Sequence, residues 1–381
     1  MMTDNGPNHV ATVIGQLSQG GSEKQLFRFL EHCDRTRWSP IVYVSGGEIG
    51  FWEDQVRALN IPIVVLNGSP LRRMLTLRRS FIKNDVRCFF SWASHTNVYG
   101  LAIWDLKIRR IGSFRNIYGF DLPERHRWLR EWANLAGINI AVCNSKETAA
   151  VVEQHIGRHK QVVYIPNSVE PAMDTARFRQ MWRERLGIED NDVLVLGVGR
   201  LAPQKNFSRF IAAVASAYKK TPLKAVVAGR DDGCLRDLQD QVAATGLPPN
   251  TIRFIGAVPD ARELMCAADM FVLSSDFEGM PNVMLEALSV GVPCVSTRVN
   301  GVNDLIEDGV NGFITDQDVD ALAARISALA ANPEQRQKMS AQAAKRISGV
   351  FAPQVVARTL WQVCEGDTVS PQMVTNMASQ D

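Results

Sequence analysis

Two glutamates eight residues apart, Glu278 and Glu286, stand in the segment that carries the most chemical information. A strand pattern over 269–274 precedes them, and Pro281 between them is well placed to start a helix. We therefore expect Glu278 in a loop at the carboxyl end of a strand, where open α/β sheets bind ligands, and Glu286 inside the helix. A carboxylate can accept hydrogen bonds from two vicinal hydroxyls of a sugar. The spacing predicts a crevice for a ligand with two polyol ends, the alternative being two solvated charges.

Two cations follow a second strand pattern. Arg200 and Lys205 lie in a loop after strand 193–199, just before a helix that could begin at Asn206. A helix start offers N–H groups, and two cations beside it would neutralise a diphosphate as it leaves. Gly20 and Gly21 end a comparable loop after the first strand, where they either let the backbone approach a phosphate or sugar or only make a turn.

These residues depend on alternating strands and helices. Apolar strand patterns separated by amphipathic helices run through both halves of the chain, and they predict two doubly wound, Rossmann-like α/β domains. We expect an N-terminal acceptor-binding domain at 1–170, a C-terminal nucleotide-sugar domain at 171–352, a helix at 353–366 and a loose tail at 367–381. The ligand crevice is expected between the domains.

Four segments in this order carry a family resemblance. They are Gly20-Gly21-Ser22-Glu23, Val163-Tyr164-Ile165-Pro166-Asn167-Ser168-Val169, Gly199-Arg200-Leu201-Ala202-Pro203-Gln204-Lys205-Asn206 and the stretch around the two glutamates. From about Val10 to about Leu360 the chain resembles the retaining glycosyltransferases of family 4, which have the GT-B fold. Ser168 departs from the family, which usually has Pro-Asn-Gly there. The resemblance implies that the last helix crosses back onto the first domain.

The resemblance also suggests roles for the candidate site. His95, in a loop after strand 87–92, would reach the donor sugar, while Arg200 and Lys205 would bind and stabilise the leaving diphosphate. Glu278 would hold sugar hydroxyls, and Glu286 the ribose. The N–H groups for the diphosphate would come from the segment Gly279, Met280, Pro281 and Asn282.

Base contacts are expected from Arg230, Phe254 and Ile255, at two further strand ends. The sequence does not say which base they favour, and UDP is chosen on family frequency. Neither domain opens with Gly-x-Gly-x-x-Gly, which argues against a dinucleotide oxidoreductase. A metal-dependent transferase would be expected to hold its metal ion with a pair of acidic residues, but the pairs at 231–232 and 316–318 are interpreted as turns. Because two cations and helix N–H groups can do a metal's electrostatic work, neither metal nor cofactor is expected.

Composition is that of an ordinary globular protein. The 381 residues are 46% hydrophobic and 22% charged, and the seven cysteines show no paired spacing that would indicate a disulfide framework or zinc site. No apolar run is long enough to span a membrane. We expect a cytoplasmic protein, either free or peripheral at the inner membrane face, with no nucleic-acid partner.

The predicted reaction moves a hexose from a nucleotide diphosphate sugar to a saccharide acceptor, with retention, in surface polysaccharide or glycan synthesis. No carboxylate nucleophile is obvious, so front-face attack with the leaving phosphate as base is the expected mechanism. The alternatives are a GT-B-fold isomerase or epimerase acting without an acceptor, and a non-catalytic sugar-nucleotide sensor.

Charge is unevenly distributed. Residues 1–170 carry 21 Lys+Arg and 15 Asp+Glu, and the excess is concentrated within 72–130. Four arginines (Arg72, Arg73, Arg78 and Arg79) lie among apolar residues, with three tryptophans further along the chain (Trp104, Trp128 and Trp132). One interpretation is docking on an anionic membrane surface to reach a polyprenyl-diphosphate-linked acceptor. The other is a solvated helix face whose leucines belong to the core.

Overall fold

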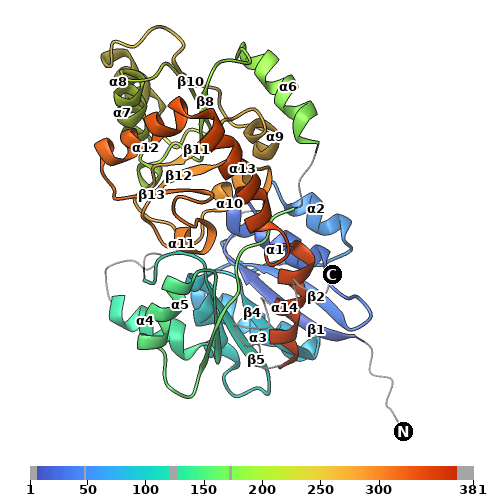
Figure 1. Ribbon diagram of the computed structural model, residues 1–381. Coiled ribbons are helices and arrows are strands. Elements are labelled where there is room, and N and C mark those ends of the chain that lie inside the picture. The colour runs from blue at the N-terminus through green and yellow to red at the C-terminus, as the bar shows by residue number, and fades with distance from the viewer. Residues whose placement is uncertain (1–6, 47–48, 120–126, 171–173, 367–381) are drawn as a thin grey trace. The chain divides into compact units, whose positions relative to one another are not determined.

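The computed structural model describes residues 7–46, 49–119, 127–170 and 174–366. The predicted tail at 367–381 and the first residues of the predicted nucleotide-sugar domain, 171–173, lie outside the described residues. The chain divides into two compact units (Figure 1). Unit 1 is Met1–Ser168 with Gly349–Asp381, and unit 2 is Val169–Ser348.

Unit 1 is built on a seven-stranded parallel sheet in the order β3-β2-β1-β4-β5-β6-β7. Its strands are β1 (Asn8–Ile14), β2 (Trp38–Val44), β3 (Ile63–Val65), β4 (Val86–Ser91), β5 (Arg109–Phe114), β6 (Ile140–Cys143) and β7 (Gln161–Tyr164). Its helices are α1 (Gly21–Glu31), α2 (Glu53–Ala58), α3 (Pro70–Lys83), η1 (Ser94–Ile103, a 3-10 helix), α4 (Arg127–Ala136), α5 (Lys146–His155) and α14 (Pro353–Glu365).

Alternate residues of each strand in unit 1 enter different cores, as a pleated strand requires. Val10 and Ile14 of β1 pack with residues of α1 and α14 on one face. Ala11 and Val13 pack with residues of α3 and η1 on the other. The last helix, α14, packs against α1, where the Trp361 ring stacks on the Phe29 ring with centroids 4.3 Å apart.

Unit 2 has a six-stranded parallel sheet in the order β10-β9-β8-β11-β12-β13. Its strands are β8 (Leu194–Val198), β9 (Lys224–Ala228), β10 (Ile252–Phe254), β11 (Met270–Leu273), β12 (Cys294–Thr297) and β13 (Gly312–Thr315). Its helices are α6 (Thr175–Leu186), η2 (Pro203–Lys205), α7 (Phe207–Tyr218), α8 (Leu235–Ala244), α9 (Ala261–Met265), α10 (Asn282–Ser289), α11 (Val302–Leu305), α12 (Val319–Ala331) and α13 (Pro333–Ile347).

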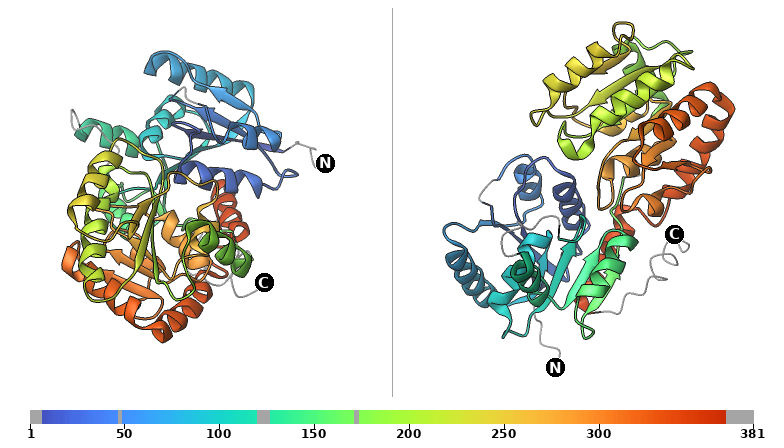
Figure 2. Two further views of the ribbon diagram at one scale, coloured as in Figure 1. Left: turned by 90° about the horizontal axis from the view of Figure 1, so that it is seen from above. Right: turned by 90° about the vertical axis from the view of Figure 1, so that its left-hand side faces the viewer.

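Helices cover both faces of each sheet (Figure 2), which confirms the predicted doubly wound α/β fold class. Each sheet has one point where the strand order reverses, between β1 and β4 in unit 1 and between β8 and β11 in unit 2. Open α/β sheets bind ligands at the carboxyl ends of the strands at such points. A candidate site residue is therefore expected near the carboxyl ends of the strands at one of these two reversal points.

Candidate active site

The carboxyl ends of β8 and β11 meet at the reversal point of unit 2, and hydrogen bonds join the loops that follow them. The backbone N–H of Asp276 donates to the carbonyl of Gln204 (2.9 Å), and the Gln204 side chain donates to the carbonyl of Phe277 (2.9 Å). The Ser274 hydroxyl donates to the carbonyl of Lys205 (2.9 Å). The two loops thus hold their side chains in a fixed arrangement.

Lys205 and Glu278 form a close ion pair within this arrangement. The Lys205 Nζ atom lies 2.6 Å from Glu278 Oε1, and the two side chains are only 15% and 9% exposed. The Ser275 hydroxyl donates to the same carboxylate oxygen at 2.7 Å. Sequence reasoning selected both residues but did not pair them. A largely dehydrated pair of this kind has few other groups to interact with, so each charge depends on the other.

Glu278 and Glu286 are both buried, with 7% and 6% of their surfaces exposed, so the alternative of a solvated loop charge and a solvated helix charge is wrong. Glu286 lies on α10, which packs against α9 and its Arg262. Burial opposes the Arg262 cation, but the hydrogen bond to Asp260 and the charges of Asp260, Glu286 and Glu170 raise the pKa of Arg262. Glu286 therefore lies in a polar neighbourhood that contains one cation, Arg262, and other carboxylates.

Arg200 and Arg230 share one carboxylate. Each guanidinium lies 2.9 Å from Asp232, and both arginine side chains are about half exposed. The hydrogen bond from Arg230 and then that from Arg200 lower the pKa of Asp232. The neighbouring Asp231 accepts backbone N–H bonds at the start of α8, as the predicted turn requires. Two cations thus face the solvent from strand ends next to the Lys205 loop.

The remaining predicted donor contacts are more dispersed. Phe254 ends the edge strand β10, and Ile255 follows it, so β9 separates them from β8. Gly279, Met280 and Pro281 are buried, and Asn282 is the first residue of α10. Because proline has no N–H, Pro281 cannot donate a backbone hydrogen bond to the diphosphate, as was predicted for this segment.

A cavity of about 450 Å³ lies at the carboxyl ends of the strands of unit 1. His95 lines it, but from the first turn of η1 rather than from the predicted loop. The His95 ring lies so close to Gly15 that a Cβ atom there would be 2.7 Å from Nε2. Gly20 and Gly21 lie at the start of α1, just before the lining residues Ser22 and Glu23.

Arg115 is a lining residue of this cavity that sequence reasoning missed. Its guanidinium stacks 4.1 Å above the Trp92 ring, and Nη1 donates to Asn167 Oδ1 at 3.0 Å. Burial lowers the pKa of Arg115 to about 9, so the group is still a cation at neutral pH. Its Nε atom has no hydrogen-bond partner in the described part of the chain. Its position directly after an apolar strand could have identified it.

The departure at Ser168 has a structural explanation. The Gln25 side chain of α1 accepts from the Ser168 N–H (2.8 Å) and hydroxyl (3.0 Å) and donates to its carbonyl (2.8 Å). Arg28 donates to the same carbonyl. The serine hydroxyl thus takes part in a buried network that fastens this segment to α1.

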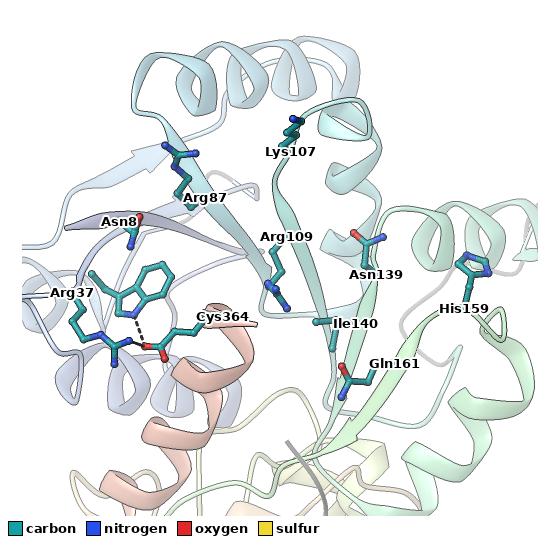
Figure 3. A pocket seen from close by; sticks show the side chains of 12 residues that line it. Asn8, Arg37, Arg87, Lys107, Arg109, Asn139, Ile140, His159, Gln161 and Cys364 are labelled. Atoms are coloured by element: carbon teal, nitrogen blue, oxygen red, sulfur yellow. Dashed lines mark hydrogen bonds and ion pairs between the residues drawn. The ribbon is translucent and has the colours of Figure 1, made fainter. Parts of the chain in front are cut away.

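A second cavity, about 940 Å³, lies at the opposite, amino edge of the unit 1 sheet (Figure 3). Arg87, Lys107 and Arg109 line it, and Arg37 is paired with Glu365 of α14 at 2.9 Å. Ligands of open α/β sheets bind at the other edge. This cavity therefore marks where the last helix joins the sheet and is not assigned to the site.

The four arginines of α3 do not form one uniform patch. Arg72 and Arg79 are exposed and Arg73 is partly buried. Arg78 forms an ion pair with Asp105 at 2.5 Å and donates to the carbonyl of Ala102 at 2.8 Å. Among the described residues, no helix is long and apolar enough to cross a membrane.

Several known proteins resemble this chain in sequence. Residues 178–346 match the family described as Glycosyl transferases group 1. An Escherichia coli enzyme named as a UDP-Gal:α-D-GlcNAc-diphosphoundecaprenol galactosyltransferase is 25% identical over 299 residues, covering 73% of this chain and 76% of that protein. A Campylobacter jejuni N-acetyl-D-galactosaminyltransferase, named for a PP-undecaprenol-linked saccharide, is 25% identical over 351 residues, covering 88% and 92%.

Solved structures show the same fold. HepE from Anabaena, in complex with UDP-glucose, superposes with a TM-score of 0.82 at 20% identity, covering 94% of this chain and all of that one (100%). The family match, the relatives and the two parallel α/β sheets lead to one assignment. Residues 178–346 belong to the group 1 glycosyltransferases, glycosyltransferase family 4, and the two units have the GT-B fold.

Proposed function

We propose that this glycosyltransferase moves a hexose, with retention, from a UDP-sugar to a saccharide hydroxyl of a polyprenyl-diphosphate-linked acceptor. The observation that carries the proposal is the buried Lys205–Glu278 pair, with Arg200 and Arg230 on neighbouring strand ends. HepE was solved with UDP-glucose, and the relatives from Escherichia coli and Campylobacter jejuni are named for undecaprenol-linked acceptors. These names support both the donor and the acceptor class.

The diphosphate would compete with carboxylates for the cations. Arg200 and Arg230 are paired with Asp232, and Lys205 with Glu278. A diphosphate carries more charge than one carboxylate, so it draws the cations to itself and leaves Glu278 able to accept hydrogen bonds from sugar hydroxyls. The other donor contacts in this proposal are Glu286 to the ribose, Gly279, Met280 and Asn282 to the diphosphate, and Arg230, Phe254 and Ile255 to the base.

The transfer breaks the bond between the sugar C1 and the β-phosphate oxygen and forms a bond from C1 to the acceptor oxygen. Attack on the face that the phosphate leaves retains the anomeric configuration, and the acceptor proton passes to the leaving phosphate. Lys205 and Arg200 stabilise the charge that develops on that phosphate, so no metal is needed. In unit 1, the cavity that His95 lines takes the acceptor.

The test uses the full chain with UDP-hexoses and UDP-N-acetylhexosamines, with and without a short-chain polyprenyl-diphosphate-linked sugar, in the presence of EDTA. We expect acceptor-dependent release of UDP and, by NMR, an α-linked product from an α-linked donor. A β-linked product, or turnover that EDTA abolishes and a divalent cation restores, would contradict the proposal. Conversion of the donor without acceptor would indicate an isomerase, and tight binding without turnover a sensor.

A further inference from the structure

Large apolar side chains are exposed on one helical layer of unit 1, the layer formed by α3, η1 and α4. Trp104, Trp128 and Trp132 are 70%, 71% and 60% exposed. The other members are Leu71, Leu75 and Ile82 of α3 and Leu129 of α4. Single exposed hydrophobic residues are ordinary, but a group of them on one surface marks an interaction site.

These side chains lie on the outer side of the same layer. Right-handed crossovers place α3, η1 and α4 on the face of the sheet opposite α1, and η1 packs against both α3 and α4. At about 100° per residue, Leu71, Leu75 and Ile82 fall within about 40° of one another on α3. Arg78 lies next to this stripe and binds Asp105, so the stripe borders the segment that carries Trp104.

Cations flank the apolar side chains. Helix α3 contains five basic residues and no acidic one. Among the described residues, Arg72, Arg79 and Lys83 of α3 and Arg130 of α4 have no ion pair, whereas Arg127 is paired with Glu131. We call the seven apolar residues and these four cations the tryptophan–arginine surface.

We propose that the tryptophan–arginine surface docks on an anionic lipid bilayer. Tryptophan rings settle at the boundary between headgroups and acyl chains, and helices with cations beside an apolar stripe lie in that plane. Each cation near an anionic surface adds about fivefold to partitioning. The buried Leu77 and Phe81 anchor α3 to the sheet, so the exposed stripe is not needed for the core.

The charge pattern favours a lipid surface over a protein partner. Protein interfaces have cores depleted of charge, with polar groups confined to the rim. Here Arg72, Arg79 and Lys83 run alongside the apolar stripe for the whole length of α3, an arrangement that lets every cation reach a phosphate while the stripe enters the membrane. The proposal rests on these exposed residues and does not depend on the donor or acceptor assigned above.

The first experiment neutralises charge. The full chain and the variant R72Q/R79Q/K83Q are floated with vesicles of phosphatidylglycerol and phosphatidylcholine, over a range of salt concentrations. We expect the wild type to bind anionic vesicles at low salt and to be released at high salt, and the variant to partition about 100-fold more weakly. The control variant K219Q/K220Q/R236Q removes three exposed cations of unit 2 and should bind like the wild type.

The second experiment removes the rings. W104S/W128S/W132S should lose binding even at low salt, whereas F51S, at another exposed aromatic of unit 1, should not. Because the three tryptophans are more than half exposed, the variant should keep the wild-type unfolding temperature. Transfer to a water-soluble acceptor analogue should be unchanged in both variants, which separates docking from the proposed activity.

Two results would overturn the proposal. One is that the wild-type chain does not bind anionic vesicles at low salt, or that both variants bind them as well as the wild type does. The other is a dimer in sedimentation analysis that the tryptophan variant dissociates, because the surface would then serve self-association.

Discussion

In unit 2 three cations at the carboxyl ends of strands each lie against a carboxylate, whereas in unit 1 the outward cations of α3 run along a stripe of exposed apolar side chains. Lys205 has Glu278, and Arg200 and Arg230 share Asp232. Arg72, Arg79 and Arg130 have no such partner among the described residues. The difference shows why counting basic residues does not identify their role. Paired cations in joined loops are positioned for one small anion, and unpaired cations on a helix suit an extended anionic surface.

The largest effect should come from Lys205→Ala. Removing one such electrostatic contact lowers turnover about 10²- to 10³-fold, because the cation meets more negative charge as the diphosphate leaves. Among the described residues, the variant also leaves the buried Glu278 carboxylate with only the Ser275 hydroxyl as a hydrogen-bond partner. Steady-state kinetics should be measured well below the unfolding temperature, with UDP affinity as the companion measurement. Unchanged turnover would remove Lys205 from the site.

Gly15→Ala should lower kcat about 10- to 100-fold, because the new Cβ atom pushes the His95 ring away from β1. Gly50→Ala is the matched control, since its nearest neighbours are 3.8 Å from the added atom. Both variants should fold, as circular dichroism would verify. Equal activity of the two would mean that the position of His95 does not matter for transfer.

Glu286→Gln should raise the donor KM about tenfold and leave kcat nearly unchanged, because a ribose contact is similar in the ground and transition states. Glu334→Gln, which changes an exposed carboxylate of α13, serves as the control. A large fall in kcat without a change in KM would place Glu286 at the reacting carbon instead.

Asp232→Asn should have the smallest effect, and its sign is informative. Loss of this carboxylate releases Arg200 and Arg230, so UDP should bind a few-fold more tightly, with a stability loss below about 1 kcal/mol for so exposed a group. Because the pKa of Asp232 is lowered, its contribution to stability is present above its unfolded pKa near 3.8 and is lost as the pH falls further. The acid limb of the unfolding curve should therefore flatten in the variant. Weaker UDP binding would show that Asp232 positions the arginines.

The fold class was predictable because apolar strands and amphipathic helices alternate along the whole chain. The edge positions of Glu278, Lys205 and Arg200 were predictable too, since glycine, proline and charged residues end each strand pattern. The pairing of Lys205 with Glu278 was not, because the residues are 73 positions apart and meet only through the adjacency of β8 and β11.

Other features required side-chain packing. The segment around His95 reads as a loop, but it forms the start of a 3-10 helix that covers the sheet with Tyr99 and Ile103. Helical spacing alone could not separate Leu77, which is buried, from Leu71 and Leu75, which are exposed. The difference lies in which side of α3 meets the sheet.

The most direct test of the account is a double-mutant cycle on Lys205→Met and Glu278→Gln, with turnover of a UDP-sugar as the measured quantity and UDP affinity alongside it. If the diphosphate takes Lys205 and frees Glu278 for the sugar, the two residues act as one unit, and the double variant should be about as slow as the worse single one. UDP affinity should change far less than turnover. Additive losses, or a double variant with wild-type turnover, would contradict the claim that this pair forms the donor site.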